Sequence, residues 1–301
     1  MGRSLLFGWL VAGLVATTGW ANSPYDELPV MPLNVPVVVD GELGDWNAQG
    51  MREGRLLSLT DSEWEVDAAT GKDAPLKEKK LRVWFGHHGE RLYFAAQWSD
   101  ETMNALYKPW KLSGNGYQRS RALDDMLVVR WQMGESFSQC MLSSTQYRTD
   151  VWRWSAGRSN LSGFADDMQH LFSNKPFDKP AREYEGNKGT VYFQNAMDEG
   201  IPGWQTEPTP KPESGPVVPS IVKVGEASGS RADVTAAGRW KDGVWTVEMS
   251  RLLKTKDPND VVLEVGGERV VQFAVFNAGY RLEKLITSPF RARLLPGEGG
   301  R

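Results

Sequence analysis

Cysteine and histidine are scarce in this chain of 301 residues, which has one cysteine, Cys140, and three histidines. A single cysteine cannot form an internal disulfide bond. It also cannot supply the thiolates of a cysteine-ligated iron–sulfur cluster or a cysteine-rich zinc site. The histidines, His87, His88 and His170, lack the spacing of a zinc-binding motif. Metal chemistry based on cysteine or paired histidines within this chain is therefore excluded.

Sequence patterns of the common catalytic and nucleotide-binding sites are also missing. The chain has no G-x-G-x-x-G fingerprint, no P-loop and no Ser-His-Asp arrangement with a known spacing. The formal net charge of −3 argues against a nucleic-acid-binding surface. We expect no nucleic-acid partner, and no catalysis by this chain alone.

Long apolar runs are lacking, and the most prominent one extends only from Leu5 to Ala16. About twelve apolar residues are too few to cross a bilayer whose hydrocarbon core is about 30 Å thick. Arg3 precedes the run, and Gly19 and Ala21 provide small residues at the positions that a signal peptidase reads. We predict a signal peptide over residues 1–21, export to the periplasm, and a mature chain without a membrane span.

Tryptophan, in contrast, is abundant, with 13 residues, and short strand patterns dominate the chain. Two hairpins are predicted, 81–85 with 91–98 and 238–240 with 244–249, and 261–265 is expected to pair with 269–276. Further strands are expected at 36–40, 126–131, 150–154 and 189–193, and a short helical turn at Ala165–Phe172. Regularly spaced strands separated by turn residues favour an all-β fold, an antiparallel β-sandwich, in one domain over residues 22–301.

Proline is concentrated between about residues 173 and 220, most densely at 207–216. Such a composition favours an extended, poorly packed segment. We interpret it as an insertion within the sandwich, either a solvated loop or a segment that docks on a partner subunit.

The run D-V-W-R-W-S-A-G-R-S-N-L-S-G-F-A-D-D extends from Asp150 to Asp167. Trp152 and Trp154 alternate, so both indoles lie on one face of an extended strand. A wide aromatic face suits a flat ligand, a porphyrin or a sugar, and it equally suits a sandwich core. The pair Asp166-Asp167 could bind a hard cation such as Ca²⁺, or could cap the expected helical turn.

This run resembles the signature D-[IVL]-W-x-W-[KR]-A-x-x-x-N-P-x-G-Y-A-D-D of the haem-binding domain of the ethylbenzene dehydrogenase gamma-subunit family. Three further blocks resemble the family in the same order. They are V-V-V-D-G-E-L-G-D-W at 37–46, G-R-W-K-D-G-V-W-T-V-E-M-S-R at 238–251, and V-Q-F-A-V-F-N at 271–277. The resemblance covers about residues 36 to 290 and implies a β-sandwich with a few short helices in its loops.

The resemblance further implies a non-covalent haem b held by an uncommon methionine and lysine pair. Met141 precedes the W-x-W strand as the family's methionine does, and Lys284 follows the F-A-V-F strand as its lysine does. A lysine ligates iron only when it is neutral, which requires a pKa well below about 10.4. Trp152, Trp154 and Phe276 are the remaining cofactor-binding residues that the resemblance implies.

By the same resemblance, the chain is an electron-transfer protein or subunit that serves a molybdenum-containing oxidoreductase, together with an iron–sulfur subunit. In another branch of the family a C-x-x-C-H haem-attachment motif begins at the position of Cys140. Ser143 and Ser144 replace its second cysteine and its histidine here, which excludes ordinary covalent haem c. Under that alignment Met141 is a spacer residue and Cys140 a free thiol, and loss of the haem remains open.

Other ligands and functions are open at this stage. Met133 and Met126 are alternative sulfur donors, and His170 is an alternative ligand, whereas His87 and His88 are expected at a solvated hairpin tip. The same strand patterns are similar to carbohydrate-binding modules, which stack sugars on tryptophan. A haem-free periplasmic adaptor that binds a partner through the proline-rich segment is the third alternative.

Overall fold

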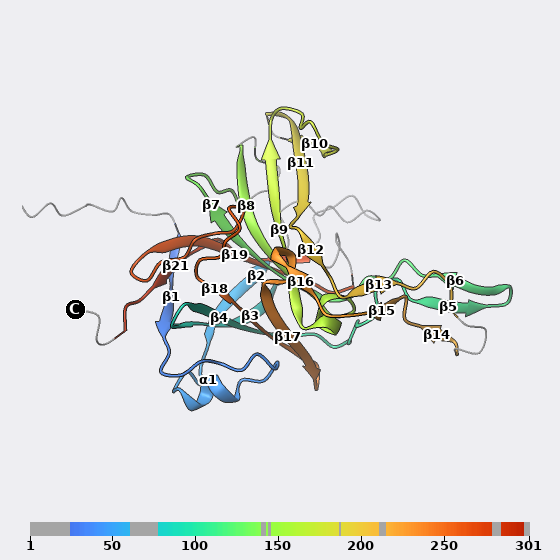
Figure 1. The fold of residues 1–301 in the computed structure, drawn as a ribbon, viewed down its shortest axis with the longest axis horizontal. Helices are drawn as coiled ribbons and strands as arrows, with labels where there is room; N and C mark the ends of the chain where they lie inside the picture. The colour runs from blue at the N-terminus through green and yellow to red at the C-terminus, as the bar shows by residue number, and fades with distance from the viewer. Residues whose placement is uncertain are drawn as a thin grey trace, which may run out of the picture.

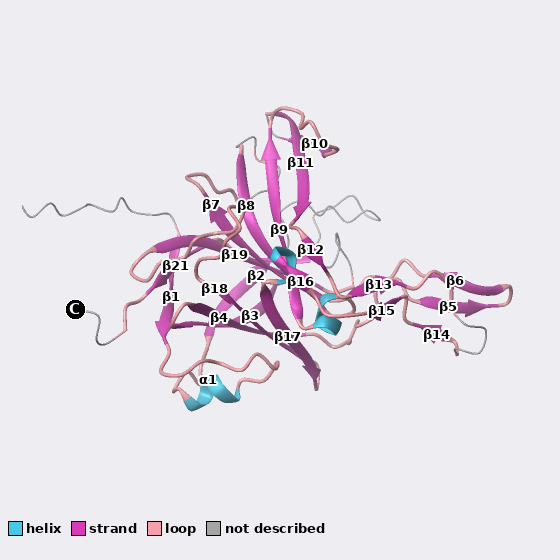
Figure 2. Ribbon diagram, viewed as in Figure 1, coloured by secondary structure: helices cyan, strands magenta, loops and turns pink. Residues whose placement is uncertain are grey.

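The protein is described by a computed structural model that covers residues 25–60, 78–139, 143, 146–186, 188–210, 215–278 and 284–297. Almost all regular structure in these ranges is strand (Figures 1 and 2). Within the described residues, helical structure is limited to α1 (Gly44–Ala48) and two 3-10 turns, η1 (Ser159–Ser162) and η2 (Ser230–Ala232). The all-β prediction is confirmed. No helix within the described ranges has the length and apolar character needed to cross a membrane.

The main sheet closes on itself through a circuit of hydrogen-bonded strands. In circuit order these are β19 (Glu268–Phe276), β7 (Met126–Met133), β8 (Tyr147–Ser155), β9 (Phe164–Ser173), β17 (Val234–Lys241), β18 (Val244–Leu252), β4 (Arg91–Ser99), β3 (Glu78–His88), β2 (Arg55–Thr60) and β20 (Lys284–Ile286), which pairs with β19 again. The pairings β9–β17 and β2–β20 that close the circuit are short. The two separate sheets expected for a sandwich are therefore one continuous, barrel-like sheet.

Two walls of this closed sheet pack against each other as the layers of a sandwich do. Phe273 on β19 lies 5.9 Å from Phe85 on β3 and 5.4 Å from Phe94 on β4, between ring centroids. Trp154 on β8 lies 5.0 Å from Trp245 on β18. The main hydrophobic core thus lies between the wall of β3, β4 and β18 and the wall of β19, β7 and β8.

The remaining strands extend the sheet or stand apart from it. β1 (Asp26–Pro32) pairs in parallel with β21 (Phe290–Leu294) and with β3, and β21 pairs with β19. β11 (Gly189–Met197) and β10 (Arg182–Gly186) continue outward from β9. β5 (Trp110–Ser113), β6 (Gly116–Arg119) and β14 (Val217–Val218) form a projecting arm at the right of Figure 1. Two small ladders complete the set, β12 (Gly200–Ile201) with β16 (Ser228–Gly229) and β13 (Trp204–Thr206) with β15 (Ile221–Lys223).

The proline-rich segment is more structured than a loop, because β10 to β14 lie within residues 173–220. Both predicted hairpins are confirmed as β3–β4 and β17–β18. The second hairpin turns through Asp242 and Gly243, which have φ of 51° and 79°, as a tight hairpin turn requires.

Three predicted elements are wrong. Residues 36–40 and 261–265 are not strands, because side chains or distant carbonyls bind their N–H groups. Val38 N donates to Asp45 Oδ2 (2.7 Å), and Val261 N donates to Asp150 Oδ2 (2.7 Å). The helical turn expected at Ala165–Phe172 is strand β9, which pairs with β8 over its whole length.

Candidate functional site

Trp152 and Trp154 lie on one face of β8, as the alternation predicts, and that face points into the core. Both side chains are 0% exposed. Trp152 packs 5.4 Å from Trp131, and Trp154 packs 5.0 Å from Trp245, between ring centroids. The indoles therefore cannot offer a surface platform on which a sugar could stack.

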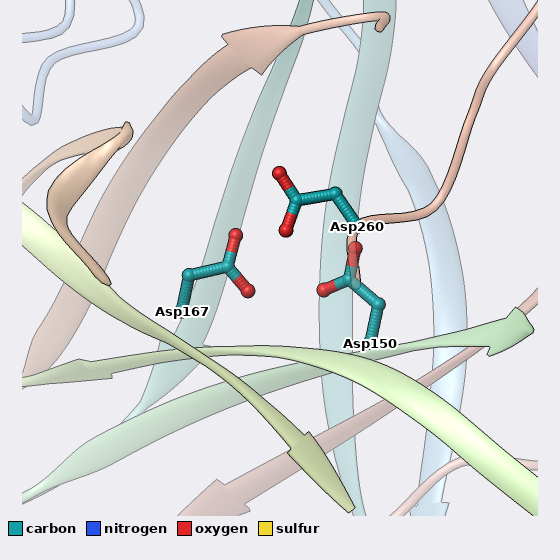
Figure 3. Close-up of side chains that lie close together, drawn as sticks. All are labelled: Asp150, Asp167 and Asp260. Atoms are coloured by element: carbon teal, nitrogen blue, oxygen red, sulfur yellow. The ribbon is translucent and has the colours of Figure 1, made fainter. Parts of the chain in front are cut away.

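Arg251, at the end of the G-x-W-x-D-G-x-W block, organises a buried ionic network beside Trp152. Its Nη1 lies 2.8 Å from Asp150 Oδ2, 3.1 Å from Asp167 Oδ2 and 3.8 Å from Asp260 Oδ1. Its guanidinium carbon lies 4.7 Å from the ring centre of Trp152. Figure 3 shows the three carboxylates converging from β8, β9 and the loop that follows β18. The first and last residues of the W-x-W…A-D-D run are thus held together by one arginine from a distant block.

The adjacent carboxylates Asp166 and Asp167 point to opposite faces of β9, so they neither cap a helix nor share a cation. Asp166 binds Arg231 (2.7 Å) and Arg153 (3.0 Å). Burial raises the pKa of Asp167 well above its usual range, and the nearby carboxylate of Asp150 raises it further. The pair is therefore neither a shared cation site nor a helix cap, the two roles that the sequence suggested. Each aspartate instead makes its own ionic contacts, Asp166 with Arg153 and Arg231, and Asp167 with Arg251.

Glu248 joins the opening D-G…D-W block to the W-x-D-G-x-W block. Its Oε2 accepts hydrogen bonds from the N–H groups of Asp40 (2.9 Å) and Gly41 (2.8 Å), and its Oε1 accepts one from Trp46 Nε1 (2.7 Å). Burial raises the pKa of Glu248 above its usual value, although these three donors act in the opposite direction.

We expect Glu248→Gln to lower the free energy of unfolding by about 1 to 3 kcal/mol, because an amide cannot accept on both sides. A carboxyl group with a raised pKa in the folded state stabilises the fold most at low pH, and that contribution is lost as the pH rises. The difference between wild type and Glu248→Gln should therefore grow as the pH is lowered from neutral toward 4.5. Urea unfolding of both proteins across this range measures it, and a difference that shrinks at low pH would contradict the assignment.

Asn160 connects the W-x-W strand to the hairpin β17–β18. Its Oδ1 accepts hydrogen bonds from Trp154 Nε1 (2.9 Å) and Gly238 N (2.8 Å), and its Nδ2 donates to Gly238 O (3.2 Å). Gly238 lies directly against the Trp154 ring, so a Cβ there would come within 2.1 Å of Cζ2. Packing around Trp154 thus explains Asn160 of the family signature and Gly238, the first residue of the 238–251 block.

Phe276 and Lys284 lie on the other side of the sheet, which we call the outer face. Phe276 is paired with both Lys284 on β20 and Met126 on β7, so these three side chains form one row. Val275 precedes Phe276 in β19, so the side chain of Val275 points to the opposite face of the sheet. On that face Val275 is in one row with Leu127 and Trp154. The predicted slot therefore cannot have Trp152 and Trp154 on the same side of the sheet as Lys284.

The outer face is apolar and buried near this row. Val128, Val151, Met168 and Ala274 form its cluster, each at most 6% exposed, and Phe276 packs against them. Lys284 is half-buried at the edge of the face. Phe276 and Lys284, which the family resemblance implies as cofactor-binding residues, thus lie beside a buried apolar cluster.

The connection from β19 toward Lys284 is anchored by Asp125. Its Oδ1 accepts from Ala278 N (3.1 Å), and its Oδ2 accepts from Trp245 Nε1 (3.0 Å) and Asn104 N (2.8 Å). Ala278 has a φ of 52°, a conformation that is uncommon for a residue with a side chain. Burial raises the pKa of Asp125 to about 7. Sequence analysis missed this residue, because an aspartate just before a strand is an ordinary pattern.

The three histidines occupy other positions. His87 is buried and lies 2.7 Å from Leu295 O, and the half-buried His88 lies 3.0 Å from Leu33 O, so the prediction that both are solvated is wrong. His170 is on β9 beside Phe193, with Nδ1 lacking a hydrogen-bond partner. Burial lowers the pKa of His170 well below its usual value, which keeps the imidazole neutral.

The two alternative sulfur donors, Met126 and Met133, make other contacts. Met126 is 0% exposed, and its Sδ lies 3.1 Å from Arg158 Nη2. Met133 packs against the main core. Met141, Cys140, Ser144 and the predicted signal peptide at 1–21 lie outside the described residues, so the Met141–Lys284 pair stays a prediction.

Fold and site together define an all-β domain of the closed-sheet type in which four sequence blocks converge on a tryptophan core. The ethylbenzene dehydrogenase family profile matches residues 62–282, and the chain belongs to this family. A search of curated proteins found no match.

Two solved structures are similar over most of their length. One is a protein from Bacteroides uniformis described as carbohydrate-binding, with a TM-score of 0.41, 8% identity, and coverage of 89% of this chain and 90% of that chain. The other is a family 9 carbohydrate-binding module from Caldicellulosiruptor kristjanssonii in complex with glucose. Its TM-score is 0.37, with 11% identity and coverage of 92% and 98%. At these TM-scores neither similarity bears on function.

Proposed function

We propose that this chain is an exported, haem-b-binding electron-transfer member of the ethylbenzene dehydrogenase family that serves a molybdenum-containing oxidoreductase. Membership of the family supports the proposal at the level of the cofactor and its partner subunits. The observation that carries it within this chain is the buried apolar outer face with Lys284 at its edge. Bound there, a haem b supplies a one-electron redox centre whose potential depends on its axial ligands.

The described residues of the outer face have distinct roles in this proposal. Phe276, Val128 and Ala274 provide a water-excluding wall, and Lys284 provides an amine, which binds iron in its uncharged form. Asp125 fixes the chain just after β19 through Ala278 N. Met141 remains the proposed second ligand, and Trp152 and Trp154 support the wall from the core side.

Titration of the purified protein with haemin, followed at the Soret band, tests the proposal. We expect one haem per chain, a band that shifts on reduction, and removal of the haem by acid–acetone. Lys284→Ala and Met141→Ala should each weaken haem binding by about tenfold or more and shift the band, because an axial ligand is lost.

Matched controls are available in exposed residues of the same types. Lys254→Ala and Met197→Ala should leave the titration unchanged, since both residues are exposed. Trp154→Phe should alter stability while it leaves the Soret position unchanged, since Trp154 faces the core. A protein that takes up no haemin would overturn the proposal and favour the haem-free adaptor, with glycan pull-down testing the carbohydrate-binding alternative.

A further inference from the structure

Six aspartates gather where β8, β9, the end of β11 and the loop after β18 meet. They are Asp150, Asp167, Asp198, Asp233, Asp257 and Asp260. Within the described ranges, Arg251 is the basic residue that pairs with members of this cluster. This guanidinium lies against three of the six carboxyl groups, so the cluster needs further positive charge or bound protons.

The cluster contains two sets of carboxylates whose oxygen atoms lie within 4.8 Å of one another, and Asp260 belongs to both. The inner set is Asp150, Asp167 and Asp260, drawn in Figure 3. Arg251 Nη1 already lies against all three of its carboxylates. A metal ion in the inner set would be repelled by that guanidinium, so the inner set is an arginine site.

Of the outer set, Asp198, Asp257 and Asp260, only Asp260 pairs with Arg251 among the described residues, at 3.8 Å. Asp198 is 8% exposed, and its Oδ2 is buried without a hydrogen-bond partner. Asp260 is 4% exposed, and its Oδ1 also lacks a hydrogen bond, at 3.8 Å from Arg251. Burial, with the neighbouring carboxylate of Asp260, raises the pKa of Asp198 to about 7. Asp198 and Asp260 thus each have a buried oxygen atom without a hydrogen bond, and one carboxylate oxygen of each lies within 4.8 Å of the other.

Asp257 completes the outer set and opens it to solvent, since it is half-buried. Its Oδ1 accepts from Asn259 N (2.8 Å), and Asp260 Oδ2 accepts from the Thr255 hydroxyl. These contacts fix the orientation of both carboxylates in the loop after β18. Each carboxylate keeps one oxygen atom that these hydrogen bonds do not use.

We propose that one Ca²⁺ ion binds among Asp198, Asp257 and Asp260 and connects the end of β11 to the loop between β18 and β19. Two oxygen atoms bound to one Ca²⁺ at about 2.4 Å are at most about 4.8 Å apart, and one oxygen atom from each carboxylate of the set lies within 4.8 Å of the others, so the set is compatible with a shared ion. An all-carboxylate set open to water on one side fits a hard cation with six to eight oxygen ligands. Mg²⁺, with bonds of about 2.1 Å, requires a tighter octahedron.

Calorimetric titration of EDTA-treated protein with CaCl₂ tests the site, together with the melting temperature in Ca²⁺ and in EDTA. We expect one ion per chain and a melting temperature several degrees higher in Ca²⁺, because the ion binds the folded state. Tb³⁺ luminescence excited through tryptophan gives a second readout. Absence of binding heat, with equal melting temperatures in Ca²⁺ and EDTA, would overturn the proposal and indicate that protons alone balance the cluster.

The variant Asp198→Asn tests whether Asp198 is a ligand of the ion. The substitution breaks no known contact, because Oδ2 of Asp198 has no hydrogen-bond partner. The variant should fold and bind Ca²⁺ at least about tenfold more weakly. The exposed Asp178→Asn is the matched control and should bind as wild type does. Unchanged affinity in Asp198→Asn would place the ion elsewhere and refute the assignment.

Discussion

Replacement of Arg251 by methionine should lower the free energy of unfolding by about 3 to 5 kcal/mol. Arg251 is 0% exposed and lies against Asp150, Asp167 and Asp260. Methionine fills a similar volume beside Trp152, so the variant removes the charge while it leaves no large cavity. Three buried carboxylates then lose their partner, and an uncompensated buried charge is costly. Arg251 Nη2 also donates to Val261 O (2.7 Å), which would be left unpaired.

Urea unfolding near neutral pH measures this effect, with Arg239→Met as the matched control. Arg239 binds Glu42 at 2.7 Å, but the two side chains are 57% and 61% exposed. An exposed ion pair contributes about 0 to 1 kcal/mol, so the control should change little. If both variants lost less than about 1 kcal/mol, the view that Arg251 organises the fold would be wrong.

Gly238→Ala should lower the free energy of unfolding by about 3 kcal/mol, at the upper end of the usual cost of overpacking. The added Cβ would lie 2.1 Å from Cζ2 of Trp154, whose side chain is fully buried. Trp154 cannot move away easily, because Asn160 holds its Nε1 and the ring lies 5.0 Å from Trp245. The strand β17 would have to shift, which strains the pairing with β18.

The effect can be separated from a general cost of replacing glycine. Gly44→Ala is the control, because a Cβ at Gly44 meets nothing within 4 Å. Trp154→Phe removes Cζ2 and Cη2 of the indole, two of the atoms that the new Cβ would meet. In a double-mutant cycle Gly238→Ala should therefore cost less in the Trp154→Phe background. Equal costs in both backgrounds would show that the clash is not the cause.

Local sequence patterns predicted the hairpins well. Residues 81–98 and 238–249 contain alternating or continuous apolar runs on each side of a short turn, and the structure has β3–β4 and β17–β18 there. Such elements depend on neighbouring residues and on turn geometry, both of which are visible in the sequence. The position of Trp152 and Trp154 on one face follows from the same period of two.

Segments whose backbone hydrogen bonds are made with residues far away in the sequence were predicted incorrectly. Residues 36–40 contain three consecutive valines and look like a strand, yet Glu248, more than 200 positions away, binds the N–H groups of Asp40 and Gly41. The apolar and acidic residues at 165–172 suit a helical turn as well as a strand, and pairing with β8 decided the outcome. Propensity is a weak guide wherever tertiary contacts supply the hydrogen bonds.

The haem site stays a prediction, but the two-sided nature of a strand separates the residues that the sequence placed together. Sequence analysis placed Trp152, Trp154, Phe276 and Lys284 around one slot, because all belong to blocks shared with the family. The register of β8, β7, β19 and β20 puts the two tryptophans on the core face and Phe276 with Lys284 on the outer face. Which face a residue shares with a distant strand depends on register, which no single strand pattern contains.

The sequence by itself determined that this protein is built from strands around a tryptophan-rich core, and that residues 62–282 belong to the ethylbenzene dehydrogenase family. These properties depend on local periodicity and composition, which are independent of long-range contacts. Only the tertiary structure decided that the sheet closes on itself, and that Arg251 collects Asp150, Asp167 and Asp260. It also decided that Asp198 and Asp257 face the same space. Those features depend on strand register and on which buried charges meet, and both arise only when distant segments pack together.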